Sequence, residues 1–503
     1  MAANTSRRLA LLAFFVVTTF VAPSSLAQQA GDTAAKAKAL DQQIIAESKK
    51  DSSLIPNLTY LSDIIGPRLT GSAALRRAND WTADKLKSYG LTNVHLESWL
   101  MPEGWERGTA TGRILEPDNG RKLSIAALGW TPGTKGKVEG EVIIVNAATL
   151  AELDAYRGKL KGKIILSGPP TELVPIADIE KPGGSATTPK TKKDKGPANF
   201  EEAMALRKQQ DVIYQQEGVL AVLQDAGKHL GLLYTGGGWT GNDRPSAVKK
   251  LPALSVAHEH YALLYRLASR PEPAKTRIEL EVNTKYIPGP IKVFNTVGEI
   301  KGTEKPDEFV VVGAHLDSWD LGQGTLDNGC GTCVVLEAAR ILAKLPPPKR
   351  TIRFVLFTGE EQGLHGSRHY VDQHKDELDK MSAALVHDTG TGKVLGLGWM
   401  SNRDALAPIL ETELACLKDL GVKELCGKGF GGSDHVSFDR GGVAGCAFNQ
   451  EIAGYRFGHH SQADTLEMAR EEDLRQGAQV MATAALRIAN MEKLLPRSAG
   501  KTK

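Results

Sequence analysis

Several acidic and imidazole side chains follow apolar, strand-like runs or glycine-rich loops, where they could bind metal ions. The candidate ligands are His315, Asp327, Glu361, Asp388 and His460. Taken singly, such residues are usually helix caps, solvated loop charges or inert, hydrogen-bonded histidines. Gathered at one place, however, the carboxylates would repel one another strongly unless cations lay between them. The set therefore predicts a metal centre.

A pair of zinc ions suits this set, because zinc prefers nitrogen and oxygen ligands and because two divalent cations would balance three carboxylates and one hydroxide. In the simplest distribution, His315 and Asp388 bind one ion. Glu361 and His460 bind the other, and Asp327 lies between the two. Paired metal ions activate a shared water and polarise a carbonyl, so we expect a hydrolytic centre.

Three residues beside these ligands have separate expected roles. Glu360 precedes the ligand Glu361 and has no metal to bind, so it could take a proton from the attacking water and pass it to the leaving amine. Asp317, two residues after His315, could orient that imidazole. His459 is the alternative to its neighbour His460 as the late ligand.

The elements that must position these residues alternate between strand and helix from Phe294 onward. Apolar runs predict strands at 308–314, 352–357, 383–387 and 394–397. Helical periodicity predicts helices at about 329–344, 366–379, 403–420 and 471–493. This alternation indicates an α/β fold with a mostly parallel sheet that helices cover on both faces. The first four ligands then follow strands, at the edge where such sheets bind ligands.

The middle of the chain has a different character and predicts a β-rich insert at 115–290. Strands are expected at 138–145, 162–167, 218–223, 253–256 and 276–282, with a helix at 200–217. The Lys-, Pro- and Gly-rich stretch 180–199 is expected to be a solvated loop. The catalytic domain would then be discontinuous, comprising 28–114 and 291–495, and 496–503 would be a polar tail.

The first residues have the features of a signal peptide. Arg7 and Arg8 precede an apolar run at 9–22, and Ser25-Leu26-Ala27 fits a cleavage site. We therefore expect cleavage after residue 27 and export to the periplasm or the exterior, with an uncleaved anchor helix as the alternative. No later segment is long and apolar enough to cross a membrane, so the mature chain is expected to have no membrane contact.

Composition excludes some partners. The formal net charge of +3 over 503 residues gives no support for nucleic-acid binding. Cys330 and Cys333 fall on a predicted helix without a second Cys pair, so we expect buried thiols, not a metal or redox site. Cys416 and Cys426 could close a short loop.

The motifs resemble those of the M28 zinc exopeptidases over nearly the whole mature chain. They are His315-x-Asp317, Gly324-x-x-Asp327-Asn328, Glu360-Glu361, Asp388 and His460-Ser461-x-x-Asp464-Thr465. The stretch 318–324 and the pair His459-His460 are most similar to the plasma glutamate carboxypeptidase branch, and the insert resembles a protease-associated domain. The resemblance implies the same ligands, with Asp327 bridging two zinc ions and Glu360 as the base.

The resemblance also implies features that the residues alone do not. The Ser433-Asp434-His435 segment should lie near the substrate, with His435 able to contact a substrate oxygen. Asp464 should support the site, the Asp327–Asn328 peptide should be cis, and the protein should form a homodimer.

The expected function is therefore an exported two-zinc exopeptidase that hydrolyses dipeptides or short peptides from the free amino end. A carboxypeptidase on the same fold is the nearest rival, because spacing does not reveal which peptide end is recognised. A glutaminyl-cyclase-type zinc acyltransferase and a receptor-like ectodomain without catalysis are more distant rivals.

Overall fold

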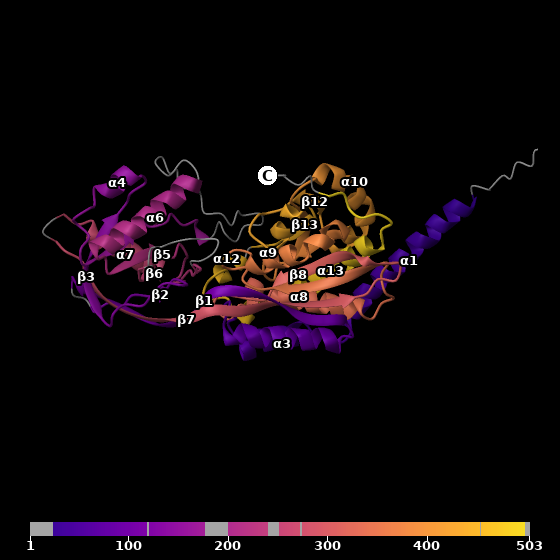
Figure 1. Cartoon of the computed structure of the whole chain (residues 1–503), viewed down its shortest axis with the longest axis horizontal. Helices are drawn as coiled ribbons and strands as arrows, with labels where there is room; N and C mark the ends of the chain where they lie inside the picture. The colour runs from indigo at the N-terminus through magenta and orange to yellow at the C-terminus, as the bar shows by residue number, and fades with distance from the viewer. Residues whose placement is uncertain are drawn as a thin grey trace, which may run out of the picture.

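Figure 1 shows two lobes joined by a long ribbon of two strands. This computed structural model describes residues 24–117, 120–176, 200–239, 251–271, 274–452 and 454–497. Most of the predicted signal peptide, the predicted loop 180–199 and most of the predicted polar tail lie outside these ranges.

The larger lobe is built on a mostly parallel sheet, as the sequence predicts. Its strands lie in the order β12-β11-β13-β10-β8-β9-β7. Strands β8, β9, β10 and β13 are mutually parallel neighbours, while β11 and β7 run antiparallel to β13 and β9. The bounds are β8 (Lys305–His315), β9 (Arg350–Phe357), β10 (Met381–Val386), β11 (Val394–Trp399), β12 (Glu424–Lys428) and β13 (Ala444–Gln450).

Helices cover both faces of this sheet, because its strands are apolar on both sides. Val310 and Val312 of β8 point into the core shared with α8 (Cys330–Leu342) and α13 (Glu471–Asn490). Phe309 and Val311 point the other way, into a core shared with α9 (His365–Gln373) and α11 (His435–Arg440). On the α8 face also lie α1 (Ser24–Lys49), α2 (Leu54–Thr59) and α3 (Ala73–Ser88).

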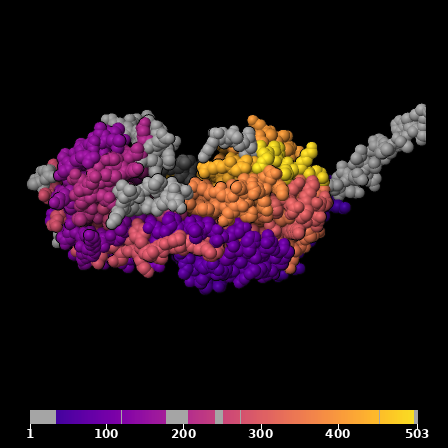
Figure 2. All heavy atoms as spheres, in the orientation of Figure 1, coloured from indigo at the N-terminus to yellow at the C-terminus, as the bar shows by residue number. Residues whose placement is uncertain are grey.

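The ribbon corrects the strands that the sequence predicts before residue 115. The sequence predicts two short strands at 94–99 and 109–114, whereas the structure has one strand, β1 (Thr92–Glu116), paired antiparallel with β7 (Arg277–Ile300). Pro102, Gly104 and Gly108 suggest a break, but register shifts at 101–103 and 107–110 absorb the irregularity. Residues 115 and 290 therefore lie within β1 and β7. In Figure 2, purple and salmon atoms of this ribbon extend along one side of the molecule between the two lobes.

The smaller lobe contains most of the expected insert. Strands β3 (Val138–Val145), β4 (Lys163–Ser167), β5 (Ala221–Asp225) and β6 (Ala253–Val256) are parallel neighbours in that order. Helix α6 (Phe200–Glu217) packs on them and matches the predicted helix. The sequence analysis missed β2 (Ile125–Ala127) and α7 (His258–Ala268), and α4 (Leu150–Asp154) is a single turn.

Several other element predictions need adjustment at their ends. The predicted helix 366–379 is α9 followed by a 3₁₀ turn, Lys375–Lys380, and the predicted helix 403–420 is α10 (Arg403–Glu413) followed by Ala415–Leu420. All five cysteines are free thiols, and Cys330 and Cys333 are buried as expected. Among the described helices, none has the length and apolarity that a membrane span needs.

Candidate active site

His315 and Asp388 meet because they follow neighbouring parallel strands. His315 is the last residue of β8, and Asp388 lies two residues beyond the end of β10. The Nε2 atom of His315 lies 2.9 Å from Asp388 Oδ1 and 3.3 Å from Asp327 Oδ1. His315 is fully buried, so this group of donors lies inside the protein.

Asp327 sits on a turn that its neighbours hold in place. The main-chain amides of Leu326 and Asp327 donate hydrogen bonds to the two carboxylate oxygens of Asp464, at 2.5 and 3.2 Å. The peptide bond from Asp327 to Asn328 is cis, as expected. Burial would raise the pKa of Asp327, but the His315 hydrogen bond and the charges of His459 and His460 lower it below its usual value.

Glu361 and His460 form the second pair on the other side of Asp327. Glu361 follows β9, the strand next to β8, and His460 follows α12 (Tyr455–Gly458). The Nε2 atom of His460 lies 2.9 Å from Glu361 Oε2 and 3.4 Å from Asp327 Oδ2. The Nε2 atom of His459 is 3.8 Å from the same Asp327 oxygen, so His460 is the nearer candidate. Asp327 thus touches both pairs.

Asp317 supports the site differently from the sequence expectation. The Nδ1 atom of His315 lies 3.0 Å from the main-chain carbonyl of Asp317 but 3.7 Å from its carboxylate. The carboxylate instead accepts hydrogen bonds from the Thr70 hydroxyl and, at 3.4 Å, from the amides of Glu360 and Glu361. Asp317 therefore fixes the glutamate turn as well as the histidine ring.

The donor set fits metal ions. Two groups of side chains each place one ligand atom per residue within 4.8 Å of the others. The first group is Asp327, His459 and His460, and the second is His315, Asp327 and Asp388. The buried atoms Asp327 Oδ2 and Glu361 Oε1 have no hydrogen-bond partner among the described residues. Burial, together with the nearby carboxylate of Asp327, raises the pKa of Glu361 well above its usual value. A cation would relieve both the unsatisfied oxygens and the repulsion.

Glu360 is buried beside these donors and belongs to neither group of ligand atoms. Burial raises the pKa of its carboxyl well above the usual value; His315 opposes this effect, and Asp388 and Asp434 reinforce it. A carboxyl group in this setting can accept and return a proton.

Asp434 and His435 lie at the start of α11, behind the site. Both are fully buried, and the Nε2 of His435 donates to the Phe430 carbonyl at 2.8 Å. Burial raises the pKa of Asp434 to about 7. Among described residues, Phe430 lines the neighbouring cavity, whereas Asp434 and His435 do not. The structure thus places this segment near the donors and gives His435 a role in holding the Phe430 loop.

The sequence analysis missed Arg68, a fully buried arginine beneath the site. Its guanidinium donates to the carbonyls of Leu316 at 2.8 Å and Gly324 at 2.6 Å, and also to Gly66 and Gln323. It therefore ties the loop after His315 to the turn that carries Asp327. Its only sequence signal is the Gly66-Pro67-Arg68 turn, which is also typical of an exposed loop.

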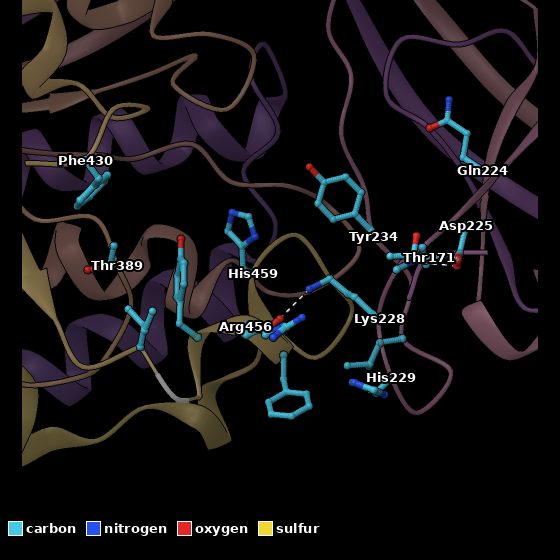
Figure 3. Close-up of a pocket in the computed structure, with 16 residues that line it drawn as sticks. Thr171, Gln224, Asp225, Lys228, His229, Tyr234, Thr389, Phe430, Arg456 and His459 are labelled. Atoms are coloured by element: carbon cyan, nitrogen blue, oxygen red, sulfur yellow. Dashed lines mark hydrogen bonds between the residues drawn. The ribbon is translucent and has the colours of Figure 1, made fainter. Parts of the chain in front are cut away.

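A cavity of about 730 Å³ lies between the smaller lobe and the donors (Figure 3). The smaller lobe contributes residues of the 224–234 segment, and the larger lobe contributes Tyr455, Arg456 and His459 among others. The amide of Thr235 donates to the His460 carbonyl at 2.9 Å, and the ring of Tyr234 lies 5.3 Å from the His460 ring. Sequence spacing could not reveal this contribution, because the two segments are more than 200 residues apart.

The fold and these donors define a metallohydrolase. Residues 295–485 match the model of Peptidase family M28. Carboxypeptidase Q of Mus musculus is 33% identical over 444 residues, covering 88% of this chain and 86% of the relative.

A peptidase M28 precursor from Shewanella amazonensis has a similar structure, with a TM-score of 0.76, 28% identity and coverage of 92% and 98% of the two chains. A zinc aminopeptidase from Bacillus subtilis shares the fold, with a TM-score of 0.60, 22% identity and coverage of 89% and 97%. The chain belongs to peptidase family M28 and is a metallo-exopeptidase.

Proposed function

We propose that this chain is a two-zinc exopeptidase that hydrolyses dipeptides and other short peptides. The observation that carries the proposal is the position of Asp327, whose two carboxylate oxygens face His315 on one side and His460 on the other, at 3.3 and 3.4 Å. Asp388 and Glu361 complete the two pairs. Nitrogen and oxygen donors of this kind suit zinc.

Bound zinc ions would make water more acidic and polarise the scissile carbonyl. The chain's own residues do the remaining work. Glu360 accepts the proton of the attacking water and transfers it to the leaving amine. Asp317 holds the main chain of Glu360 and Glu361, and Asp464 holds Asp327, so the reacting groups keep their positions.

Dipeptides are the favoured substrate class because their one peptide bond adjoins both ends. One relative is named a carboxypeptidase and one fold neighbour an aminopeptidase, and a dipeptide satisfies both descriptions. We further propose that the protein is exported by the amino-terminal signal, acts on peptides without nucleic-acid or membrane partners, and forms a homodimer, as the family resemblance implies.

The Glu360→Gln variant tests the mechanism. The amide cannot accept the proton, so kcat on a dipeptide should fall by roughly 10²- to 10⁴-fold. Zinc content, measured by mass spectrometry, should remain that of the wild type, because Glu360 is not among the proposed ligands.

Glu411→Gln on the surface of α10 is the matched control and should leave kcat unchanged. Wild-type hydrolysis by Glu360→Gln with zinc bound would refute the proton-transfer role. A panel of free, amino-blocked and carboxyl-blocked dipeptides separates dipeptidase, aminopeptidase and carboxypeptidase activity. Formation of pyroglutamate from an amino-terminal glutamine peptide, with its peptide bonds intact, would indicate the cyclase instead, and absence of both zinc and hydrolysis would indicate a non-catalytic protein.

A further inference from the structure

Two basic side chains face each other across the cavity beside the proposed zinc ligands. Lys228 follows β5 in the smaller lobe, and Arg456 belongs to α12 in the larger lobe. Lys228 Nζ donates a hydrogen bond to the main-chain carbonyl of Arg456 at 2.7 Å. In Figure 3 this lysine reaches from its own lobe toward Arg456, and His459 lies nearby. The two lobes therefore bring two cations together.

Neither cation has an acidic partner among the residues that the structure describes. Buried arginines elsewhere in the molecule do: Arg340 pairs with Glu337, and Arg353 pairs with Glu299 and Glu377. The buried Nη1 atom of Arg456 has no hydrogen-bond partner within the described ranges. Burial lowers the pKa of Lys228 to about 8, repulsion from Arg456 adds to this effect, and Asp327 opposes it. Among the described residues that line the cavity, Asp225 is the one acidic side chain.

The one carboxylate on the same loop does not neutralise Lys228. Asp225 accepts hydrogen bonds from the amides of Gly227 and Thr171, and its Oδ2 lies 3.0 Å from the Nδ1 of His258. These contacts shape the turn that presents Lys228 and occupy both oxygens of Asp225. Asp225 therefore stabilises the turn that carries Lys228 without forming an ion pair with it.

We propose that Lys228 and Arg456 bind a carboxylate of the substrate on the leaving side of the scissile bond. The proposal rests on the exopeptidase function above and specifies its substrate class. His459 lines the same cavity beside the proposed zinc ligands. A dipeptide whose scissile carbonyl lies at those ligands can therefore place its free carboxylate at Lys228 and Arg456, where opposite charges attract. An acidic side chain in the leaving residue offers the same chemistry. Recognition of a free carboxylate would limit the enzyme to dipeptides and to peptides shortened from the carboxyl end.

The Lys228→Met variant tests this subsite, because methionine keeps the length and apolar stem but removes the charge. The KM of alanyl-alanine should rise by roughly 10- to 100-fold, which is the contribution of a charge-assisted hydrogen bond. The KM of alanyl-alaninamide should be the same in both proteins. Lys228→Arg should retain most of the wild-type preference, and the exposed Lys208→Met on α6 controls for the loss of a surface charge.

The substrate arms distinguish the source of the carboxylate. If wild type prefers alanyl-alanine to its amide, the main-chain carboxylate is bound. If it prefers the α-amide of alanyl-aspartic acid to alanyl-alaninamide, the side chain is bound. An unchanged KM for alanyl-alanine in Lys228→Met, with folding and zinc content intact, would overturn the subsite.

A binding experiment distinguishes failure of the proposed carboxylate subsite from failure of the proposed exopeptidase function. Calorimetry with zinc-loaded Glu360→Gln should detect alanyl-alanine, and the added Lys228→Met change should weaken that binding by a similar factor. Binding without any turnover by the wild type would reject the hydrolase and keep the subsite. Equal binding with and without Lys228 would reject the subsite alone.

Discussion

At the scale of single residues, Arg68 is a buried cation whose partners are mainly main-chain carbonyls. Burial lowers its pKa to about 10, and Asp464 and Asp317 act in the opposite direction. Without Arg68, the main-chain carbonyl oxygens of these buried loops would lack this hydrogen-bond donor. Gly324 is required beside it, because a Cβ there would lie 2.9 Å from Arg68 Nη2 and 2.3 Å from Ser318, and φ is +66°. Arg68 therefore stabilises the turn that carries Asp327.

Replacing Arg68 by Leu should destabilise the protein by at least about 3 kcal/mol, because each orphaned buried carbonyl costs ~1–3 kcal/mol. Chemical denaturation of the zinc-free protein would measure this without the contribution of metal binding. Arg157→Leu, which removes an exposed ion pair with Asp154, should change stability by less than about 1 kcal/mol. Equal changes in the free energy of unfolding for the two substitutions would contradict the role of Arg68 in stabilising the turn that carries Asp327.

The residues that could be predicted from the sequence are those whose position follows from strand direction. His315 and Asp388 follow apolar runs, and parallel strands bring their carboxyl ends to one edge. Arg68 and Lys228 could not be predicted in this way. Each lies on an irregular segment, and its partners come from distant parts of the chain, so no local periodicity marks it.

At the scale of elements, β1, β9 and α9 are joined by a network of charges on the face away from α8. His374, the residue after α9, contacts Glu97 of β1 at 3.0 Å and Glu377 at 2.9 Å, and Glu377 also pairs with Arg353 of β9. Burial lowers the pKa of His374, but the hydrogen bonds and charge of Glu97 and the hydrogen bond of Glu377 outweigh it. The pKa therefore lies above 6.5 in the folded protein.

This network should make stability depend on pH. A raised pKa in the folded state means that the contribution of His374 is fully present below about pH 6.5 and is lost as pH rises through the folded pKa. The pKa values of Glu97 and Glu377 are lowered, so their contribution is lost at acidic pH. Between about pH 6 and pH 9, the urea midpoint of wild type should fall more than that of His374→Gln.

Glu97→Gln should reduce the same pH dependence, because it removes the main partner of His374. Glu97 also contacts His95 at 2.9 Å, so His374→Gln is the variant that isolates the contribution of His374. Parallel curves for wild type and His374→Gln would show that the network contributes no proton-linked stability.

Element prediction succeeded where residues that break regular structure mark the ends of an element. Helix α6 and strands β3 and β6 have the predicted bounds, and Gly218 follows α6 while Pro252 precedes β6. Strand β1 was predicted as two pieces, since bulges restore pairing after residues that usually end strands. Helix α12 was missed because one turn is too short to show a period.

At the scale of the whole molecule, the smaller lobe is held against the site by Arg107 of β1. Arg107 donates to Asp320 at 2.7 Å, to Thr235 at 2.8 Å and to the Ala127 carbonyl. The amide of Thr235 in turn donates to the carbonyl of His460, whose φ of 55° is unusual for a residue other than glycine. The smaller lobe therefore helps to keep His460, a proposed metal ligand, in this strained backbone conformation.

Replacing Arg107 by Met should consequently act at the metal site as well as on stability. It leaves Asp320 as an unpaired, nearly buried charge, which costs about 3–5 kcal/mol. Loss of the support behind His460 should also weaken zinc binding at the proposed site that includes His460 by roughly 10-fold or more, as measured by competition with a chromophoric chelator. Hydrogen exchange at the Thr235 amide should become faster in the same variant.

The matched control is Arg113→Met, which removes an exposed arginine that pairs with Glu279 on the same ribbon. It should leave zinc affinity and exchange at Thr235 unchanged. A double-mutant cycle with Asp320→Leu then separates the ion pair from the bond to Thr235. If Asp320→Leu restores stability to Arg107→Met but not zinc affinity, the hydrogen bond to Thr235 carries the effect on the metal. Wild-type zinc affinity in Arg107→Met would show instead that His460 is positioned by its own lobe alone.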